Sequence, residues 1–345
     1  MGKAEENITR QNILRKRKLY AQKRRRAFLK LIAFLTLLAA ILAVLIFLGY
    51  TLVSFGSRIY RDYQTMYDGY AARQQAKRGD VDAKFDGYTN ILVMGIDNGA
   101  DESEDSGKRA DTIIVISLNN NTGKASFINI PRDTWVTVPN TNTGTRLKSI
   151  YAMGGSPLMV REVNSLLGIS IHQYVALDMQ TFADLIDILG GIDLYVEGNM
   201  VYEDSEAGLS INLSQGYQHL DGETAQKYLR YRSLELGDIG RAKRQQKFIK
   251  ALYQEVLQLK TVPKLPQIAE VFQSRVETSA EIFDAAHLAN VLRQMSSDVP
   301  ESLILPGAPS ENDDTIWIPD KMEIDKRMQE LFPADTLITT EEETK

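Results

Sequence analysis

TNILVMGID at residues 89–97 is the segment from which the fold class is predicted first. It is a short apolar run that ends in Gly-Ile-Asp, which is typical of a buried strand whose carboxyl end opens into a site. DTIIVISLN at 111–119 and KASFINIPR at 124–132 predict two further strands. The residues NNTG at 120–123 indicate a hairpin turn between them, because Asn and Gly tolerate positive φ angles.

Further along the chain, predicted strands and helices alternate. Apolar residues at helical spacing around 160–167 predict a helix, and YVALDM and IDLYV predict strands at 174–179 and 192–196. Three more segments predict helices, at 222–232, 239–260 and 280–297. This alternation, with at least one antiparallel hairpin, predicts an α/β fold.

Upstream of this region, residues 31–55 contain no charged side chain. A helix of this length, at 1.5 Å per residue, exceeds the ~30 Å hydrocarbon thickness of a bilayer. A cleaved leader has a shorter apolar core that ends at small residues, so we expect a retained membrane anchor. Residues 1–30 hold eleven Lys and Arg against two Glu, which places the N-terminus in the cytoplasm and residues 56–345 outside.

Composition excludes several kinds of chemistry. The chain has no cysteine, which rules out disulfides, thiolate metal sites and cysteine nucleophiles, and its three histidines lie far apart. A large exterior domain without cysteine suits a Gram-positive-type envelope. We interpret the basic residues at 1–30 as a topology determinant beside membrane lipid rather than a nucleic-acid site, since the rest of the chain is acidic.

Two carboxylates lie at the ends of predicted strands. Asp97 ends one predicted strand and Asp111 begins the next, so neighbouring strands would bring both to one rim. Paired carboxylates suit Mg²⁺, which completes its octahedron with water and phosphate oxygens. The alternative is that both residues serve only as turn or cap residues.

Cations are concentrated in the same part of an otherwise acidic domain. Arg109 shares a strand face with Asp111, and Arg132 follows Pro131 where the chain is expected to leave the sheet. We expect Arg241, Arg244 and Gln245 to form one helical face. Arg is favoured where phosphate is bound in a bidentate manner, although a solvated helix surface is the alternative for any single residue. The segment 230–247 carries six cations: Arg230, Arg232, Arg241, Lys243, Arg244 and Lys247.

These residues belong to blocks that resemble a known family. NILVMGID, RADT, INIPRDTWV, YAMGG, LGGID, GETAQKYLRYR and DIGRAKRQQ, in this order, are similar to the signature blocks of the LytR–CpsA–Psr (LCP) cell-wall assembly enzymes. The resemblance covers residues 89–257. It implies an α/β/α sandwich with a central mixed sheet and an apolar lipid-binding cavity, preceded by one transmembrane helix.

The resemblance also implies an activity. LCP enzymes move a glycopolymer, such as wall teichoic acid or capsular polysaccharide, from undecaprenyl pyrophosphate to peptidoglycan through a phosphodiester bond. By motif position, Asp97 and Asp111 would hold Mg²⁺, and Asp238 would orient arginines or assist proton transfer. The residues implied to grip the phosphates are Arg109, Arg132, Arg230, Arg232, Arg241 and Gln245.

One position departs from the family pattern. The family often has Lys five residues before the tyrosine of the Tyr-Ala-x-Gly-Gly block, whereas this chain has Arg146 there and Lys148 two residues later, so either side chain would supply the cation. The expected organisation is a basic cytoplasmic tail, a transmembrane helix, a juxtamembrane linker, the catalytic domain, and a C-terminal helical extension with an acidic tail, at 1–30, 31–55, 56–88, 89–257 and 258–345. Two alternative functions remain: a prenyl or nucleotide pyrophosphatase, and a non-catalytic envelope regulator that binds polyprenyl phosphate.

Overall fold

The computed structural model describes residues 44–58, 61, 85, 87–97, 108–138, 143–204, 209–231, 237–280 and 285–333. The chain divides into two compact units, Met1–Lys77 and Arg78–Lys345. In the first unit residues 44–58 are helical, while most of the span predicted at 31–55 and the whole basic tail at 1–30 lie outside the described residues. None of the described helices combines the length and apolar character needed to cross a bilayer.

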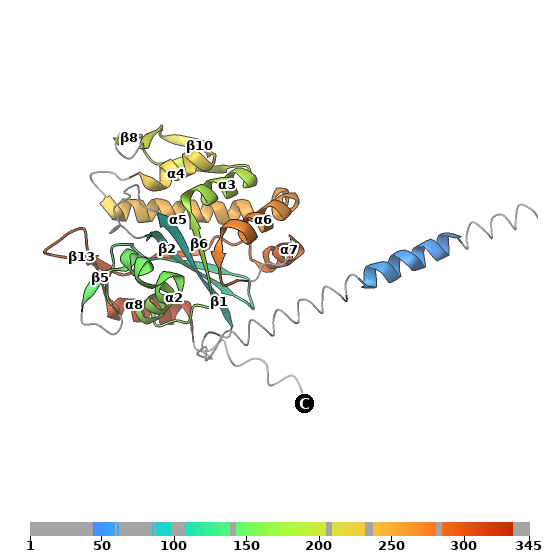
Figure 1. Ribbon diagram of the computed structural model, residues 1–345, viewed down its shortest axis with the longest axis horizontal. Coiled ribbons are helices and arrows are strands. Elements are labelled where there is room, and N and C mark those ends of the chain that lie inside the picture. The colour runs from blue at the N-terminus through green and yellow to red at the C-terminus, as the bar shows by residue number, and fades with distance from the viewer. Residues whose placement is uncertain are drawn as a thin grey trace, which may run out of the picture. The chain divides into compact units, whose positions relative to one another are not determined.

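A six-stranded mixed sheet forms the centre of the second unit, in the order β11-β6-β1-β2-β3-β12 (Figure 1). The hairpin-linked strands β1, β2 and β3 are antiparallel, whereas β6 runs parallel to β1 and β12 runs parallel to β3. β11 completes the sheet antiparallel to β6. The strands are β1 (Tyr88–Asp97), β2 (Arg109–Asn119), β3 (Ala125–Asn129), β6 (Gln173–Asp178), β11 (Glu277–Thr278) and β12 (Glu301–Ile304). The mixed sheet predicted from the resemblance is therefore confirmed.

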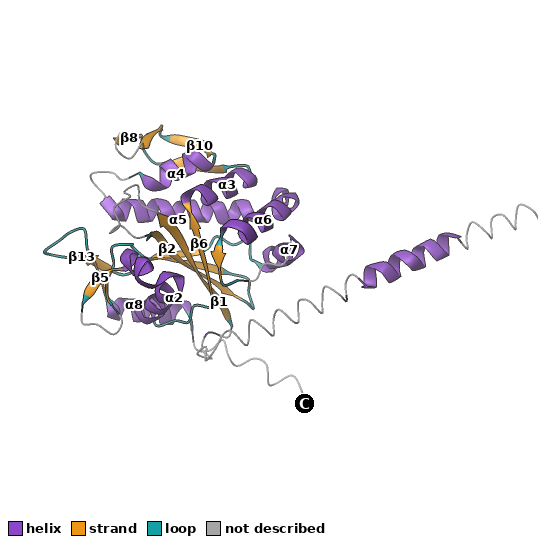
Figure 2. Cartoon of the chain, viewed as in Figure 1, coloured by secondary structure: helices purple, strands orange, loops and turns teal. Residues whose placement is uncertain are grey.

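Helices cover both faces of this sheet (Figure 2). One face packs against α2 (Leu147–Leu167) and α8 (Lys321–Leu331). Helices over the other face are α3 (Met179–Leu189), α5 (Gly237–Val256), α6 (Leu265–Arg275) and α7 (Ala285–Gln294).

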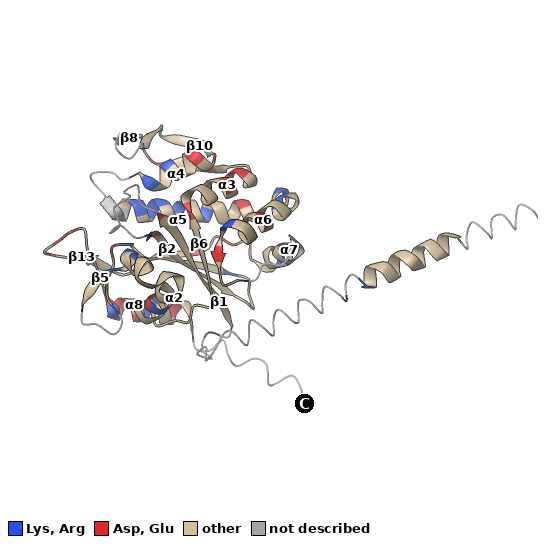
Figure 3. Ribbon diagram, viewed as in Figure 1, with Lys and Arg blue, Asp and Glu red and all other residues tan. Residues whose placement is uncertain are grey.

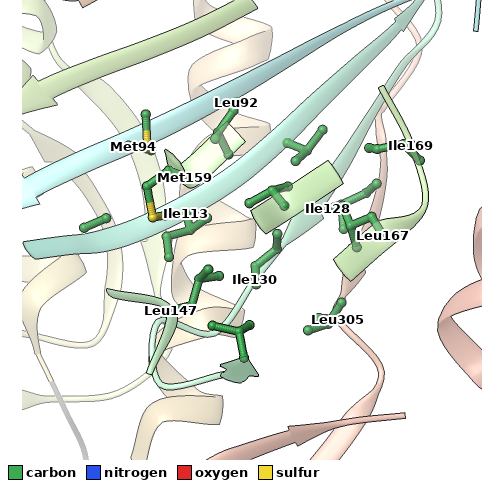
Figure 4. Packing of buried hydrophobic residues seen from close by; sticks show 14 of the residues in the cluster. Leu92, Met94, Ile113, Ile128, Ile130, Leu147, Met159, Leu167, Ile169 and Leu305 are labelled. Carbon is green, nitrogen blue, oxygen red and sulfur yellow. The ribbon is translucent and has the colours of Figure 1, made fainter. Parts of the chain in front are cut away.

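Strand alternation determines which side chains enter the core. Along β1 every second residue is buried, and Leu92 and Met94 pack with Ile113 of β2 and Met159 of α2 (Figure 4). On the opposite face Phe127 of β3 contacts Tyr253 of α5 edge to face, with ring centroids 5.8 Å apart. The two faces thus form separate apolar layers.

The hairpin turn expected at 120–123 is present. Gly123 has a φ of 69°, a conformation that side chains with a Cβ rarely adopt. Its N–H donates to the carbonyl oxygen of Asn119 at 2.8 Å. This turn sets β2 and β3 side by side.

A smaller group of elements packs on α3 and α5. Its core includes Ile192, Leu194 and Val196 from β7, Tyr228 from α4 and Phe248 from α5. These contacts fix the end of α4 beside α5. The elements are β7 (Ile192–Val196), β8 (Met200–Asp204), β9 (Leu209–Leu213), β10 (Gly216–Leu220) and α4 (Gly222–Arg230).

The C-terminal segment contributes to the sheet and to the main core. β11 and β12 occupy its two edges, and Ile324 and Met328 of α8 are buried against the α2 side. The chain from 258 onward is thus not a helical appendage to a domain that ends at 257. Edge strands of two and four residues carry too short an apolar pattern to be read from sequence.

An ion pair between α3 and α6 gives a pH prediction. Hydrogen bonds from Arg275 and Gln180 hold the pKa of Asp184 below its ordinary value. A depressed pKa means that the carboxylate stabilises the fold above its unfolded-state pKa, and that this contribution is lost as the pH falls through the folded-state value. We expect Asp184→Asn to lower the free energy of unfolding by about 0.5 kcal/mol at neutral pH. In urea titrations the difference in the free energy of unfolding between wild type and variant should shrink below about pH 4. A difference that does not change with pH would contradict this prediction.

Candidate active site

The end of the β1–β2 ladder carries a β-bulge that orients Asp111. Gly95 lies opposite Thr112, but the register then shifts so that Ile96 lies opposite Ala110 and Asp97 opposite Arg109. Asp111 is the extra residue of β2. Because side chains alternate along a strand, the extra residue places Asp111 and Thr112 on one face, the face that Asp97 also occupies.

Arg132 joins this group from the loop after β3. Its guanidinium forms an ion pair with Oδ2 of Asp111, and the two side chains are 14% and 29% exposed. The other carboxylate oxygen of Asp111, Oδ1, is buried and has no hydrogen-bond partner among the described residues. Burying a carboxylate oxygen without a partner costs folding free energy unless a bound ligand or ion contacts that oxygen.

Asp133 lies directly behind Arg132 and connects it to two further cations. Its carboxylate is 2.7 Å from Nζ of Lys148, 3.3 Å from Nε of Arg132 and 3.3 Å from Nη1 of Arg146. Nη2 of Arg146 in turn donates to Asp313 at 3.2 Å and to the Thr315 hydroxyl at 2.7 Å. Arg146 and Lys148 are therefore both part of the same charged cluster as Arg132.

Two short two-stranded sheets support the residues of this cluster. Arg146 ends β5, and Thr315 lies between the strands of the C-terminal hairpin. The sheets are β4 (Trp135–Thr137) with β5 (Gly144–Arg146), and β13 (Gly307–Pro309) with β14 (Trp317–Pro319).

Helix α5 contributes Gln245 and Arg241. Gln245 is buried, donates to the Thr112 hydroxyl at 3.2 Å and accepts from the Asn129 amide at 3.2 Å. These bonds dock α5 beside the bulge. Arg241 lies one turn earlier on the same helical face and is also buried. Lys and Arg gather along the N-terminal half of α5 and the adjacent C-terminal end of α4 (Figure 3).

Arg244, expected on the face of Arg241, has a different role. It donates to the backbone carbonyl of Tyr231, lies 5.2 Å from the centre of that ring and is 3.9 Å from Glu197. Burial lowers the pKa of Arg244. Glu197 also accepts from the Tyr228 hydroxyl at 3.0 Å, and burial raises the pKa of Tyr228. Arg244 thus binds the end of α4 to α5.

The remaining predicted residues are placed as follows. Arg109 is exposed at the strand rim opposite Asp97, and Arg230 is exposed at the last residue of α4. Arg232 and the side chain of Asp238 lie outside the described part of the chain. The structure therefore brings together Asp97, Arg109, Asp111, Arg132, Arg146, Lys148 and Gln245, with Arg241 on the face of Gln245.

Comparison with known proteins identifies the chain's family. A family model described as the LytR_cpsA_psr family matches residues 53–332. The chain belongs to this LCP family. Its TagU relative from Enterococcus faecalis, named a polyisoprenyl-teichoic acid–peptidoglycan teichoic acid transferase, is 30% identical over 253 residues, 73% of this chain and 81% of that protein.

Two further relatives are similar to this chain, and one of them is named as a regulator. TagV of Bacillus subtilis, named like TagU, is 30% identical over 262 residues, which are 73% of this chain and 66% of that protein. The crystal structure of TagV aligns with a TM-score of 0.59 at 29% identity, covering 70% of this chain and 96% of that one. Regulatory protein MsrR of Staphylococcus aureus is 30% identical over 198 residues, 57% of this chain and 58% of that protein. The α/β fold with a central mixed sheet matches the structures of this LCP family.

Several residues of this LCP member's site were not predicted from its sequence. Asp133 lies in the INIPRDTWV block. Its position next to Arg132 is the one feature of the sequence that could have indicated a place in the site. Thr112 and Asn129 read as ordinary strand residues. Asp313 and Thr315 come from the C-terminal segment, where no local pattern pointed to a site.

The carboxylates of the site fit a magnesium ion. Mg²⁺ takes one or two protein carboxylates and keeps water or phosphate oxygens as its other ligands. Asp97 and Asp111 meet this requirement, and the orphaned Oδ1 of Asp111 is a suitable donor. Among the described residues no group of three or more His, Asp or Glu side chains forms a metal site. The donor set therefore suits a cation shared with a phosphorylated ligand rather than an all-protein cage.

Proposed function

We propose that this chain is an extracytoplasmic phosphotransferase that moves a glycopolymer from undecaprenyl pyrophosphate to peptidoglycan through a phosphodiester bond. The observation that carries the proposal is the Asp111–Arg132 pair beside Asp97 and Arg109, with an unpartnered carboxylate oxygen at its centre. The names of TagU and TagV, each a polyisoprenyl-teichoic acid–peptidoglycan teichoic acid transferase, support it. The glycopolymer is of the wall teichoic acid or capsular polysaccharide type.

In the proposed reaction, an acceptor hydroxyl of peptidoglycan attacks the phosphorus nearest the sugar. A new O–P bond forms, the bridging P–O bond breaks, and polyprenyl monophosphate leaves. Arg132 and Arg109 bind and orient the non-bridging oxygens, and Gln245 holds α5 with Arg241 beside them. Magnesium, held by Asp97 and Asp111, would neutralise phosphate charge. Such transfer depends on positioning and electrostatic stabilisation.

The acceptor hydroxyl must also lose a proton. We propose Asp238 as the group that receives it or that orients the neighbouring arginines. The proposal rests on motif position, in the block DIGRAKRQQ. No covalent enzyme intermediate is required, because the acceptor oxygen attacks directly.

A half-buried apolar row supports a prenyl site. Ile91 and Val93 of β1 share the sheet face of Asp97, and Val93 pairs with Val175 while Gly95 pairs with Leu177 of β6. All four aliphatic side chains are only partly buried although they lie on central strands. Ligand-binding sites usually combine accessible apolar surface with a few polar groups. We assign this row to the prenyl chain.

The location of the reaction follows from the sequence. We propose that residues 31–55 anchor the chain in the cell membrane, with the N-terminus inside and the catalytic domain outside. A membrane-bound donor and a wall acceptor would both reach a site held there. The proposed reaction involves no nucleic-acid partner.

The test is a transfer assay with a labelled glycan on a polyprenyl pyrophosphate carrier and peptidoglycan as acceptor. Transfer predicts label in peptidoglycan, a pyrophosphatase releases only phosphate, and a non-catalytic binder gives neither product. Addition of EDTA is expected to lower transfer at least about 100-fold, because the phosphate charge loses its counter-ion. Added Mg²⁺ should restore the rate, whereas transfer that persists in EDTA would contradict the metal assignment.

A further inference from the structure

We propose that Asp133 is a positioning residue that fixes the cations of the donor-phosphate site. This inference rests on the proposed function, because it concerns how the same site selects a diphosphate. Asp133 has a side chain only 6% exposed, yet its two oxygens contact three cations from two parts of the chain. In this role it acts through Arg132 and Lys148 and not on the reacting groups.

The backbone around Asp133 locks it between the site and the C-terminal hairpin. Lys148 N–H donates to the carbonyl oxygen of Arg132 at 2.9 Å, and Leu147 N–H donates to that of Thr134 at 2.8 Å. The Trp317 N–H donates to the carbonyl oxygen of Asp133 itself at 3.0 Å. The carboxylate therefore starts from a fixed backbone position.

The charges explain why a carboxylate is needed here. Arg146 is the N-cap of α2 and Lys148 lies in its first turn, which holds no acidic residue. Cations at a helix N-terminus are unfavourable, because the helix dipole places positive charge there. Without Asp133, these cations and Arg132 would repel one another before a phosphate arrives.

The two cations of α2 are engaged differently. Both terminal nitrogens of Arg146 have partners, since Nη1 contacts Asp133 and Nη2 donates to Asp313 and Thr315. Nζ of Lys148 contacts Asp133 alone among the described residues, and an ammonium group carries three donors. We therefore assign Lys148, with Arg132, to the phosphate, and Arg146 to the link with the C-terminal hairpin.

The experiment measures selectivity, which does not depend on transfer. Full-length wild type and Asp133→Asn are titrated with farnesyl pyrophosphate and with farnesyl phosphate. We expect the preference for the diphosphate to fall about tenfold, because cations that lose their fixed geometry no longer match two adjacent phosphates. Affinity for inorganic phosphate should stay equal or rise, since the site has lost a negative charge. A preference within twofold of wild type would overturn the proposal.

A second set of variants applies if Asp133→Asn does not fold. Lys148→Met leaves Asp133 paired with two arginines and is expected to lower the preference about tenfold. Arg146→Met should lower it less. The matched control is Lys124→Met, at an exposed lysine whose ion-pair partner among the described residues is Asp298. Equal losses in Lys148→Met and Arg146→Met would overturn the assignment. If wild type prefers the diphosphate but transfers no glycan, the proposed function fails while this inference stands.

Discussion

Asp111→Asn is expected to lower glycopolymer transfer about 10³-fold, the upper range for loss of one preorganised electrostatic group. An amide cannot neutralise Arg132, with which Asp111 now forms an ion pair, and it is a weaker ligand for a hard cation. No neighbouring residue of β2 can take the place of Asp111, because Asp111 is the extra residue that the register shift turns toward Asp97. The measurement is the rate of label incorporation into peptidoglycan at saturating donor.

Asp193→Asn is the matched control for this variant. Asp193 lies on β7, its side chain is 79% exposed and its partner is His219 at 2.8 Å. The same chemical change there should leave transfer unaltered. A folded Asp111→Asn protein that retains more than a tenth of wild-type transfer would refute the assigned role of Asp111.

Gly222→Ala is expected to produce the largest loss of stability. A Cβ at this position would lie 2.3 Å from the carbonyl oxygen and 2.7 Å from the carbonyl carbon of Ala183 in α3. Both atoms belong to the backbone, so α3 and α4 would have to separate. Overpacking of this kind costs about 3 kcal/mol, and thermal unfolding should shift down by about 8 °C.

The separation would also strain the start of α4. Gly222 N–H donates to the carboxylate of Asp187 at 2.7 Å, and Asp221 caps the helix by accepting from Thr224 N–H at 2.8 Å. Gly198→Ala provides the control, because nothing lies within 4 Å of the Cβ it would add. Equal melting temperatures for the two variants would show that the α3–α4 contact is not tight.

The core of this fold was predictable because its strands are long and apolar. The runs at 89–97 and 111–119, with the Asn-Asn-Thr-Gly turn at 120–123, correspond to β1, β2 and the β2–β3 turn within one or two residues. Patterns of this length are the strongest local signal for secondary structure. The two-residue and four-residue edge strands carry no such signal.

The assembly of the site was only partly predictable. That Asp97 and Asp111 share a rim followed from their strand ends, but the bulge that gives them one face depends on a register shift that no local pattern reveals. Arg244 shows the same limit, because helical spacing placed it near Arg241 while a long-range contact with Glu197 and Tyr231 determines its direction. Asp313 reaches Arg146 across 167 positions of sequence.

The pairing of β12 with β3 determines when this protein can finish folding. The residues that complete the sheet, 301–304, lie far downstream of β3 in the sequence and leave the ribosome long after it. Until then β3 keeps an open edge of backbone donors and acceptors, which is a template for association with other chains. Completion of the sheet is therefore a late step, and the β3 edge stays open to association with other chains until residues 301–304 have been synthesised.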